Sequence, residues 1–255
     1  MRFLREQVFQ EAIFFPQKTW FPDATVIKIG RTRLACYRHE INDGDRTVVY
    51  FHGNAECVGQ MARYLGRLFA ACHLNLFLVE YPGYSHSSGT PSLELILKHA
   101  AKILRCLGLD PQRVIIWGRS LGCFPALRTA EAHPDIFGLV LESSAGSYES
   151  YRSRVCSRIP GDHRKSLSEA FPSELSVSVT LQRCAARKLF LSSSNDPVSI
   201  SAAMELHALA SEPKRAVFLP YGTHNSLMSA NLEEVIFEIE SLAHEKKYPS
   251  SPFVK

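Results

Sequence analysis

The chain has 255 residues and a net charge of +4 at neutral pH, and 45% of its residues are hydrophobic and 21% charged. This is the composition of an ordinary globular protein, and a chain of this length can bury a sizeable core without disulfide or metal staples. The weak positive charge does not indicate a nucleic-acid-binding protein, so we expect no nucleic-acid partner.

The first half of the chain alternates short apolar runs with segments of helical periodicity. Runs rich in β-branched and aromatic residues predict strands, whereas apolar residues that recur every three or four positions predict helices. Thr90 and Pro91 are typical of the N-cap and first position of a helix that extends to about Leu107. The expected strands are Val26–Ile29, Leu34–Tyr37, Thr47–Phe51 and Leu74–Glu80, and a further helix is expected over Met61–Ala71.

The second half continues the same alternation after one irregular stretch. The expected strands are Val114–Trp117, Leu139–Glu142, Leu189–Ser192 and Ala216–Leu219, and the expected helices are Ser120–Ala132, Ile200–Ala210 and a last one that ends near Ala243. Residues 145–187 are rich in Ser and Arg, lack clear periodicity and are too long for an ordinary connection. We therefore predict a single α/β domain over residues 1–255. It has a mostly parallel central sheet with helices on both faces, and residues 145–187 form a cap over the active site.

The most informative motif is Gly-Arg-Ser-Leu-Gly at residues 118–122, directly after the apolar run Val114–Trp117. A G-x-S-x-G segment between a buried strand and a helix is typical of the nucleophile elbow of serine hydrolases. The turn is too tight for a Cβ atom at its flanking positions, which explains the two glycines. Ser120 is therefore the candidate nucleophile.

Two further residues follow in the chain order that an elbow of this kind requires. Asp196 and then His224 each come just after a predicted strand, so both are expected at the edge of the sheet where the elbow lies. We predict that His224 is the base and Asp196 the acid that orients it. Glu142, at the end of its own strand, is an alternative acid, and Asp196 could instead serve only to cap the helix that follows it.

The loop His-Gly-Asn-Ala at residues 52–55 follows the strand Thr47–Phe51 and is built from small residues. We assign the oxyanion hole to the backbone N–H groups of Asn54 and Leu121, with Ala55 as an alternative to Asn54. His52 is expected to brace this loop through hydrogen bonds rather than to act in catalysis. For Arg119, inside the elbow, pairing with a carboxylate or packing against the cap is expected.

The remaining features bear on location and partners. Seven scattered cysteines form no C-x-x-C pair, and the histidines form no H-E-x-x-H motif, so we predict neither a metal site nor a cofactor. This cysteine usage favours a reducing, cytoplasmic compartment, and no apolar stretch reaches the length of a membrane span. The cap carries a basic group that is either a solvated face or a contact for a membrane or anionic substrate: Arg152, Arg154, Arg158, Arg164 and Lys165.

These motifs together resemble the α/β-hydrolase superfamily. The match extends beyond the triad to Gly59–Met61, to the Tyr-Pro-Gly-Tyr-Ser turn at residues 81–85 and to Pro125. Within this superfamily, the sequence is similar to the subgroup of α/β-hydrolase-domain depalmitoylases and bud-emergence-type membrane-associated hydrolases. The resemblance covers roughly residues 45–245, and Arg119 stands where the depalmitoylases commonly have glutamine. It implies Ser120, Asp196 and His224 as the triad, and hydrolysis of acyl esters or thioesters as the chemistry.

We therefore expect a cofactor-free serine hydrolase that acts on a small acyl ester or an acylated protein, as a carboxylesterase, a lipase-like enzyme or an acyl-protein thioesterase. Two alternatives remain open. A peptidase of the same fold would need a carboxylate cluster or an extra domain to recognise a peptide amine, and the sequence indicates neither. A catalytically silent binding protein would not need Ser120, Asp196 and His224 in the required order.

Overall fold

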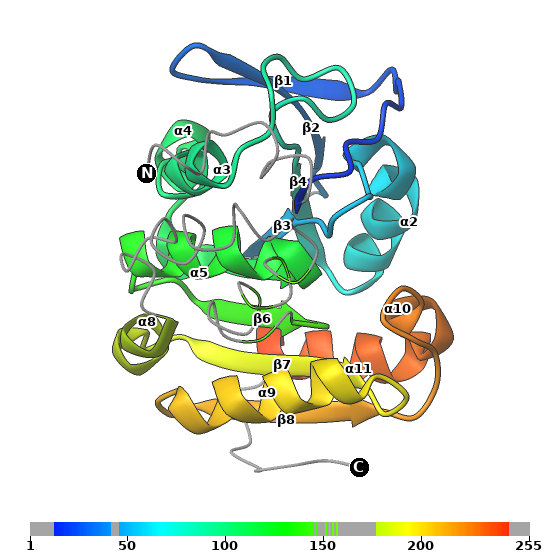
Figure 1. The fold of residues 1–255 in the computed structure, drawn as a ribbon, viewed down its shortest axis with the longest axis vertical. Helices are drawn as coiled ribbons and strands as arrows, with labels where there is room; N and C mark the ends of the chain where they lie inside the picture. Colours follow the sequence, from blue (N-terminus) through cyan, green and yellow to red (C-terminus); the bar gives the residue numbers. More distant parts are fainter. Residues whose placement is uncertain are drawn as a thin grey trace.

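The computed structural model describes residues 13–41, 46–144 and 177–244, together with 146, 151, 153, 155 and 157. Eight strands form one sheet in the order β1-β2-β4-β3-β5-β6-β7-β8 (Figure 1). β1 and β2 form an antiparallel hairpin, β2 also pairs antiparallel with β4, and all other pairs are parallel. The strands are β1 Ala24–Ile29, β2 Thr32–His39, β3 Arg46–Phe51, β4 Leu74–Val79, β5 Val114–Arg119, β6 Gly138–Glu142, β7 Arg187–Ser193 and β8 Lys214–Leu219.

Helices cover both faces of this sheet, and each face has its own apolar core. One core joins α3, α5, α8 and α9 to side chains such as Val49 and Ile116, while the other joins α2, α10 and α11 to the alternate side chains, such as Tyr50 and Trp117. In Figure 1, α5 and α9 lie in front of the sheet and α11 behind it. The helices are α2 Val58–Ala71, α3 Leu93–Ala100, α4 Ile103–Leu107, α5 Cys123–Ala132, α8 Val177–Arg183, α9 Pro197–Leu209, α10 Leu227–Ala230 and α11 Leu232–His244.

The central strands are buried on both faces, which explains their continuous apolar sequence. Every residue of β5 and β6 is buried, including the polar residues at their carboxyl ends. A parallel strand between two helical layers has no solvated face, so it cannot show the alternation of an exposed sheet. The expected α/β architecture is confirmed.

The segment between β4 and β5 differs from the prediction. Its helix begins after Ser92, whose Oγ accepts a hydrogen bond from the Leu95 N–H at 3.2 Å, and not at Thr90. Pro91 lies in the preceding loop and packs tightly on Gly83. A Cβ added to Gly83 would lie 2.6 Å from Pro91 Cδ. The predicted single helix is two helices, α3 and α4, which are separated at Ala101 and Lys102.

The predicted cap, residues 145–187, falls largely outside the described residues, and so do its five basic residues. Near its start, the ring of Tyr151 packs against Phe124 of α5 with 4.9 Å between ring centroids. Its last part is α8, which packs against α5 and α9, followed by the first residue of β7. The last part of the predicted cap therefore forms a helix, α8, in the helical layer that contains α5 and α9.

A buried histidine in α3 gives a prediction about acid stability. Burial lowers the pKa of His99 from 6.5 to about 4, with Lys102 adding to the effect. The unfolded chain binds this proton below pH 6.5 and the folded chain does not, so stability falls as the pH drops from 6.5 towards 4. Replacement by glutamine removes this dependence. We expect the free energy of unfolding of His99→Gln, relative to wild type, to rise by roughly 2 kcal/mol between pH 7 and pH 4.5.

Urea unfolding at these two pH values measures the difference. The exposed His86 provides the control for the chemical change itself, with His86→Gln measured at the same two pH values. An equal loss of stability in His99→Gln and wild type on acidification would contradict the assignment.

Candidate active site

The nucleophile elbow lies between β5 and a short 3-10 turn, Ser120–Gly122, that leads into α5. Ser120 has a backbone φ of 51°, in the left-handed region that non-glycine residues rarely adopt. The conformation requires close approach on both sides. A Cβ on Gly118 would lie 2.5 Å from the carbonyl oxygen of Gly122, and one on Gly122 would lie 2.1 Å from that of Phe51. Both motif glycines are therefore steric requirements of the turn.

The three predicted triad residues meet at the carboxyl edge of the sheet. Ser120 Oγ lies 2.9 Å from His224 Nε2, and His224 Nδ1 lies 2.8 Å from Asp196 Oδ2. The His224 side chain is 39% exposed and that of Asp196 14%, so the imidazole is accessible while the carboxylate behind it is mostly covered. A hydroxyl, an imidazole and a carboxylate in this order can move a proton from the hydroxyl to the imidazole.

Asp196 also caps α9, so both roles considered for it occur together. Its Oδ1 accepts the Ser199 N–H at 3.2 Å, and its Oδ2 accepts hydrogen bonds from the Ser199 hydroxyl and from His224. Burial alone would raise the pKa of Asp196, but these hydrogen bonds outweigh it and lower the pKa below its ordinary value. The carboxylate is ionised at neutral pH and can stabilise an imidazolium.

The turns that carry Asp196 and His224 are tied to each other. Ser193, at the end of β7, donates its hydroxyl hydrogen to the Gly222 carbonyl at 2.8 Å, and Asn195 Nδ2 donates to the same oxygen at 3.2 Å. These bonds cross from the loop after β7 to the loop after β8. They fix the separation of the carboxylate and the imidazole.

Glu142, the alternative acid, is engaged elsewhere. Its carboxylate accepts hydrogen bonds from Trp117 Nε1 at 2.8 Å and from the Tyr50 hydroxyl at 3.3 Å, and its Oε1 lies 3.2 Å from Arg119 Nε. None of the hydrogen bonds found among the described residues joins Glu142 to His224. The geometry favours Asp196 over Glu142 as the partner of the imidazole.

Among residues 53–55 of the loop after β3, one backbone donor is left available for an oxyanion. The Gly53 N–H donates to Glu56 Oε2 at 2.6 Å and the Ala55 N–H to Asn54 Oδ1 at 3.0 Å. Within the described parts of the chain, neither the Asn54 N–H nor the Leu121 N–H has an acceptor. The Leu121 amide is in the first turn of the 3-10 helix, where donors lack partners. This pattern favours Asn54 over Ala55 as the second donor.

His52 fixes the direction of the Asn54 N–H. Its Nδ1 lies 2.7 Å from the Gly53 carbonyl oxygen and its Nε2 lies 2.7 Å from Glu80 Oε1, so both ring nitrogens face acceptors. Although burial opposes the charged form, Glu80 and the Gly53 carbonyl outweigh it and raise the pKa of His52. A trans peptide places its C=O and N–H on opposite sides, so holding the Gly53 oxygen turns the Asn54 N–H the other way. The expected bracing role is confirmed.

A matching family model identifies the chain. The model described as alpha/beta hydrolase fold matches residues 46–227. The chain belongs to the alpha/beta hydrolase family. The match includes the elbow, the loop at residues 52–55, Asp196 and His224, so the residues of this candidate site lie within the family domain.

Curated relatives of this alpha/beta hydrolase include bacterial and animal proteins. Protein YfhR of Salmonella typhi, which is named as uncharacterized, is 30% identical over 200 residues, which cover 70% of this chain and 64% of YfhR. The alpha/beta hydrolase domain-containing protein aho-3 of Caenorhabditis elegans is 32% identical over 148 residues, which cover 56% of this chain and 42% of the relative. The chain thus spans less than two thirds of the length of these relatives.

Solved structures share the fold of this alpha/beta hydrolase. The esterase EaEST of Exiguobacterium antarcticum has a TM-score of 0.62 and 17% identity, and the match covers 87% of this chain and all of EaEST. The esterase Pf2001 of Pyrococcus furiosus has a TM-score of 0.64 and 14% identity, and the match covers 89% of this chain and 98% of Pf2001. At such identities the likeness establishes the fold, whereas the activity has to be argued from the site.

A second candidate nucleophile near the elbow is excluded by its environment. Cys123 begins α5, and its thiol donates to the Gly118 carbonyl at 3.2 Å. Burial raises its pKa to about 12, despite hydrogen bonds that act in the opposite direction. The thiol is therefore protonated at neutral pH and is a poor nucleophile.

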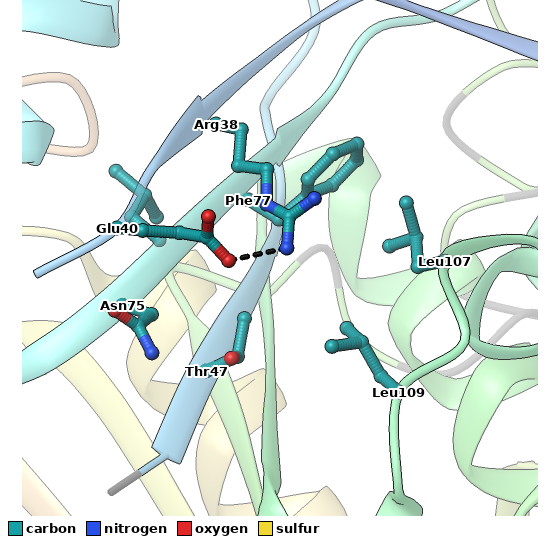
Figure 2. Close-up of a pocket in the computed structure, with 8 residues that line it drawn as sticks. Arg38, Glu40, Thr47, Asn75, Phe77, Leu107 and Leu109 are labelled. Atoms are coloured by element: carbon teal, nitrogen blue, oxygen red, sulfur yellow. Dashed lines mark hydrogen bonds and ion pairs between the residues drawn. The ribbon is translucent and has the colours of Figure 1, made fainter. Parts of the chain in front are cut away.

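A small hollow at the other edge of the sheet does not belong to the site (Figure 2). It lies beside Thr47 and Asn75, near the amino ends of β3 and β4, and its volume is about 20 Å³. This is room for about one water molecule. Arg38 and Glu40 form an ion pair in it, and Asn75 accepts the Ile41 N–H at 2.9 Å. These contacts stabilise the sheet edge.

Within the described part of the chain, the helices are too short or too polar to cross a bilayer.

Proposed function

We propose that this alpha/beta hydrolase cleaves ester or thioester bonds of acyl substrates through an acyl-enzyme on Ser120. The observation that carries the proposal is the continuous hydrogen-bonded series from Ser120 through His224 to Asp196. An ionised carboxylate fixes the imidazole with its free nitrogen towards the hydroxyl, which is the arrangement that nucleophilic acyl transfer requires.

In the first half of the reaction, Ser120 Oγ attacks the substrate carbonyl carbon while His224 Nε2 takes its proton. The tetrahedral oxyanion accepts hydrogen bonds from the Asn54 and Leu121 N–H groups. Loss of one such donor typically raises the barrier by about 3–4 kcal/mol. His224 then gives the proton to the leaving alkoxide or thiolate as the carbon–oxygen or carbon–sulfur bond breaks.

In the second half, His224 takes a proton from water, and the resulting nucleophile attacks the acyl-Ser120 ester. Collapse of the second tetrahedral intermediate releases the carboxylic acid and returns the proton to Ser120. Asp196 stabilises the imidazolium in both halves and does not itself become protonated. Every proton transfer and bond change uses these residues and water, so the proposed mechanism needs no cofactor.

The substrate that we propose is a small acyl ester or an acylated protein. The resemblance to depalmitoylases supports including a palmitoyl thioester in this proposal. A cytoplasmic location, with peripheral membrane contact through the basic residues of the cap, remains a prediction.

Covalent labelling tests the chemistry. A fluorophosphonate should label the folded protein at Ser120, as read by mass spectrometry of the modified peptide, and should not label Ser120→Ala. A panel of p-nitrophenyl esters from acetyl to palmitoyl, with palmitoyl-thioester peptide alongside, then gives the acyl length and leaving group. Absence of labelling in folded protein would favour a silent binding protein, and hydrolysis of peptide amides alone would favour a peptidase.

The choice of acid gives a separate prediction. We expect Asp196→Asn to lower kcat by about 10³–10⁴-fold, because an amide cannot hold the imidazole in the required tautomer or stabilise its charge. Glu142→Gln should lower kcat much less, since Glu142 does not contact His224. Turnover of p-nitrophenyl acetate, normalised to the folded fraction in circular dichroism, compares the two variants. A larger loss in Glu142→Gln at equal stability would make Glu142 the acid.

A further inference from the structure

Arg119 lies inside the elbow motif, next to Ser120, yet the proposed chemistry does not use it. It is the last residue of β5, and only 6% of its side chain is exposed. Its guanidinium reaches four acceptors on three separate segments. These are Glu56, the Glu142 carboxylate at 3.2 Å, the His224 carbonyl oxygen at 2.8 Å and, at 3.5 Å, Asn225 Oδ1.

Two of these segments carry opposite sides of the proposed site. Through Glu56, the guanidinium is joined to the loop that supplies the Asn54 N–H, because the other oxygen of that carboxylate accepts the Gly53 N–H at 2.6 Å. Through the His224 carbonyl it is joined to the backbone of the proposed base. The contact with the loop is close, since a Cβ on Gly53 would lie 2.9 Å from Arg119 Nη1.

The third segment anchors the side chain. Glu142 is 1% exposed and also accepts hydrogen bonds from Trp117 and Tyr50, so its carboxylate is fixed in the core. Its ion pair with Nε holds the guanidinium from this side and leaves the two terminal nitrogens for Glu56 and His224. A planar fork with five donors can serve acceptors in several directions at once, whereas a lysine ammonium cannot hold this fixed geometry.

We propose that Arg119 is a positioning residue that holds the oxyanion loop and the His224 loop at a fixed separation across the nucleophile, with Glu56 as its partner on the loop side. The proposal rests on the proposed function, because it assigns the two loops their roles. A glutamine at this position would be shorter and uncharged, and it could not bridge two carboxylates and a carbonyl in this way.

The sharpest test is Glu56→Gln, because Glu56 is 24% exposed and its replacement leaves the buried Arg119–Glu142 pair intact. Glutamine keeps the length and one acceptor for Gly53 but removes the charge that holds the guanidinium. We expect kcat for an ester substrate to fall about tenfold, with KM within about twofold of wild type, because displacement of an oxyanion donor affects the transition state more than substrate binding.

Arg119→Gln should lower kcat further, by about 100-fold, because both loops lose their connection. The double variant should be no slower than Arg119→Gln alone, since Glu56 acts through Arg119. Glu131→Gln is the matched control. It breaks an ion pair with Arg128 on α5 and should keep the wild-type kcat. Urea unfolding of each variant separates a loss of folded protein from a loss of kcat.

An unchanged kcat in folded Glu56→Gln, or an effect confined to KM, would overturn the positioning role. If Arg119→Gln does not fold, Glu56→Gln alone decides. A loss of about 10⁵–10⁶-fold in turnover in Ser120→Ala tests the proposed function separately. A failure of that function is therefore distinguishable from a failure of the Arg119 role alone.

Discussion

Replacing Ser120 with alanine should lower kcat for ester hydrolysis by about 10⁵–10⁶-fold, the loss typical of removing the nucleophile of a triad. The Ser120 hydroxyl is placed to attack, since it lies 2.9 Å from His224 Nε2, whereas the nearby Cys123 thiol is buried and protonated. A residual rate above that in water should persist, because the oxyanion donors and the substrate site remain.

Stability should change little in this variant. Serine and alanine at position 120 face the same steric cost at a φ of 51°. Among the described residues, the Ser120 hydroxyl is hydrogen-bonded only to a partly exposed imidazole. Initial rates with p-nitrophenyl acetate and urea unfolding measure both effects. Ser229→Ala, which removes an exposed hydroxyl bonded to the Ser226 carbonyl, is the control and should retain full activity. Turnover within tenfold of wild type in folded Ser120→Ala would place the nucleophile elsewhere.

The positions of the triad residues could be predicted because they depend on local patterns. A buried parallel strand is a continuous apolar run, and the residue after it lies at the carboxyl edge of the sheet. Ser120, Asp196 and His224 each follow such a run. The shared edge of the predicted strands was expected to bring together residues that lie 104 and 28 positions apart in the sequence. In the structure these pairs, Ser120–His224 and His224–Asp196, lie within hydrogen-bond distance.

The residues that support the triad carry no comparable signal. Glu80 holds His52, and Glu56 and Glu142 hold Arg119, through contacts between segments that are distant in sequence. A glutamate at the end of a strand or in a turn could equally be a solvated charge. Ser199 is the exception, because a serine three residues after the N-cap Asp196 is placed to contact the cap.

The start of α3 was predicted wrongly for the same reason, because a contact that local sequence does not reveal decides it. Thr90 followed by Pro91 is a good local signal, but Ser92 is an equally good N-cap residue. The packing of Pro91 on the Gly83 turn decides between them, and that contact joins two parts of the loop between β4 and α3. The break between α3 and α4 contains neither Pro nor Gly, so no local pattern predicted it.

Replacing Gly122 with alanine should destabilise the protein by more than about 4 kcal/mol, which is exceptional for one methyl group. Its φ of −62° suits any residue, so the cost is steric. The new Cβ would lie 2.1 Å from the Phe51 carbonyl oxygen and 2.7 Å from that of His52. Both are backbone atoms at the start of the oxyanion loop, so relief requires the elbow and the loop to separate.

Gly108→Ala is the matched control, because that glycine has a φ of 64° with no atom within 4 Å of the added Cβ. It isolates the left-handed backbone cost of about 1–2 kcal/mol from steric contact. Thermal unfolding should therefore show a Tm about 10 °C or more below wild type for Gly122→Ala and a smaller fall for Gly108→Ala. Any Gly122→Ala protein that stays folded should also lose the proposed ester hydrolysis, because the loop at residues 52–55 must move. Equal stability of the two variants would show that the elbow can accommodate a side chain at position 122. The close approach of β3 and α5 would then not be what holds Ser120 in place.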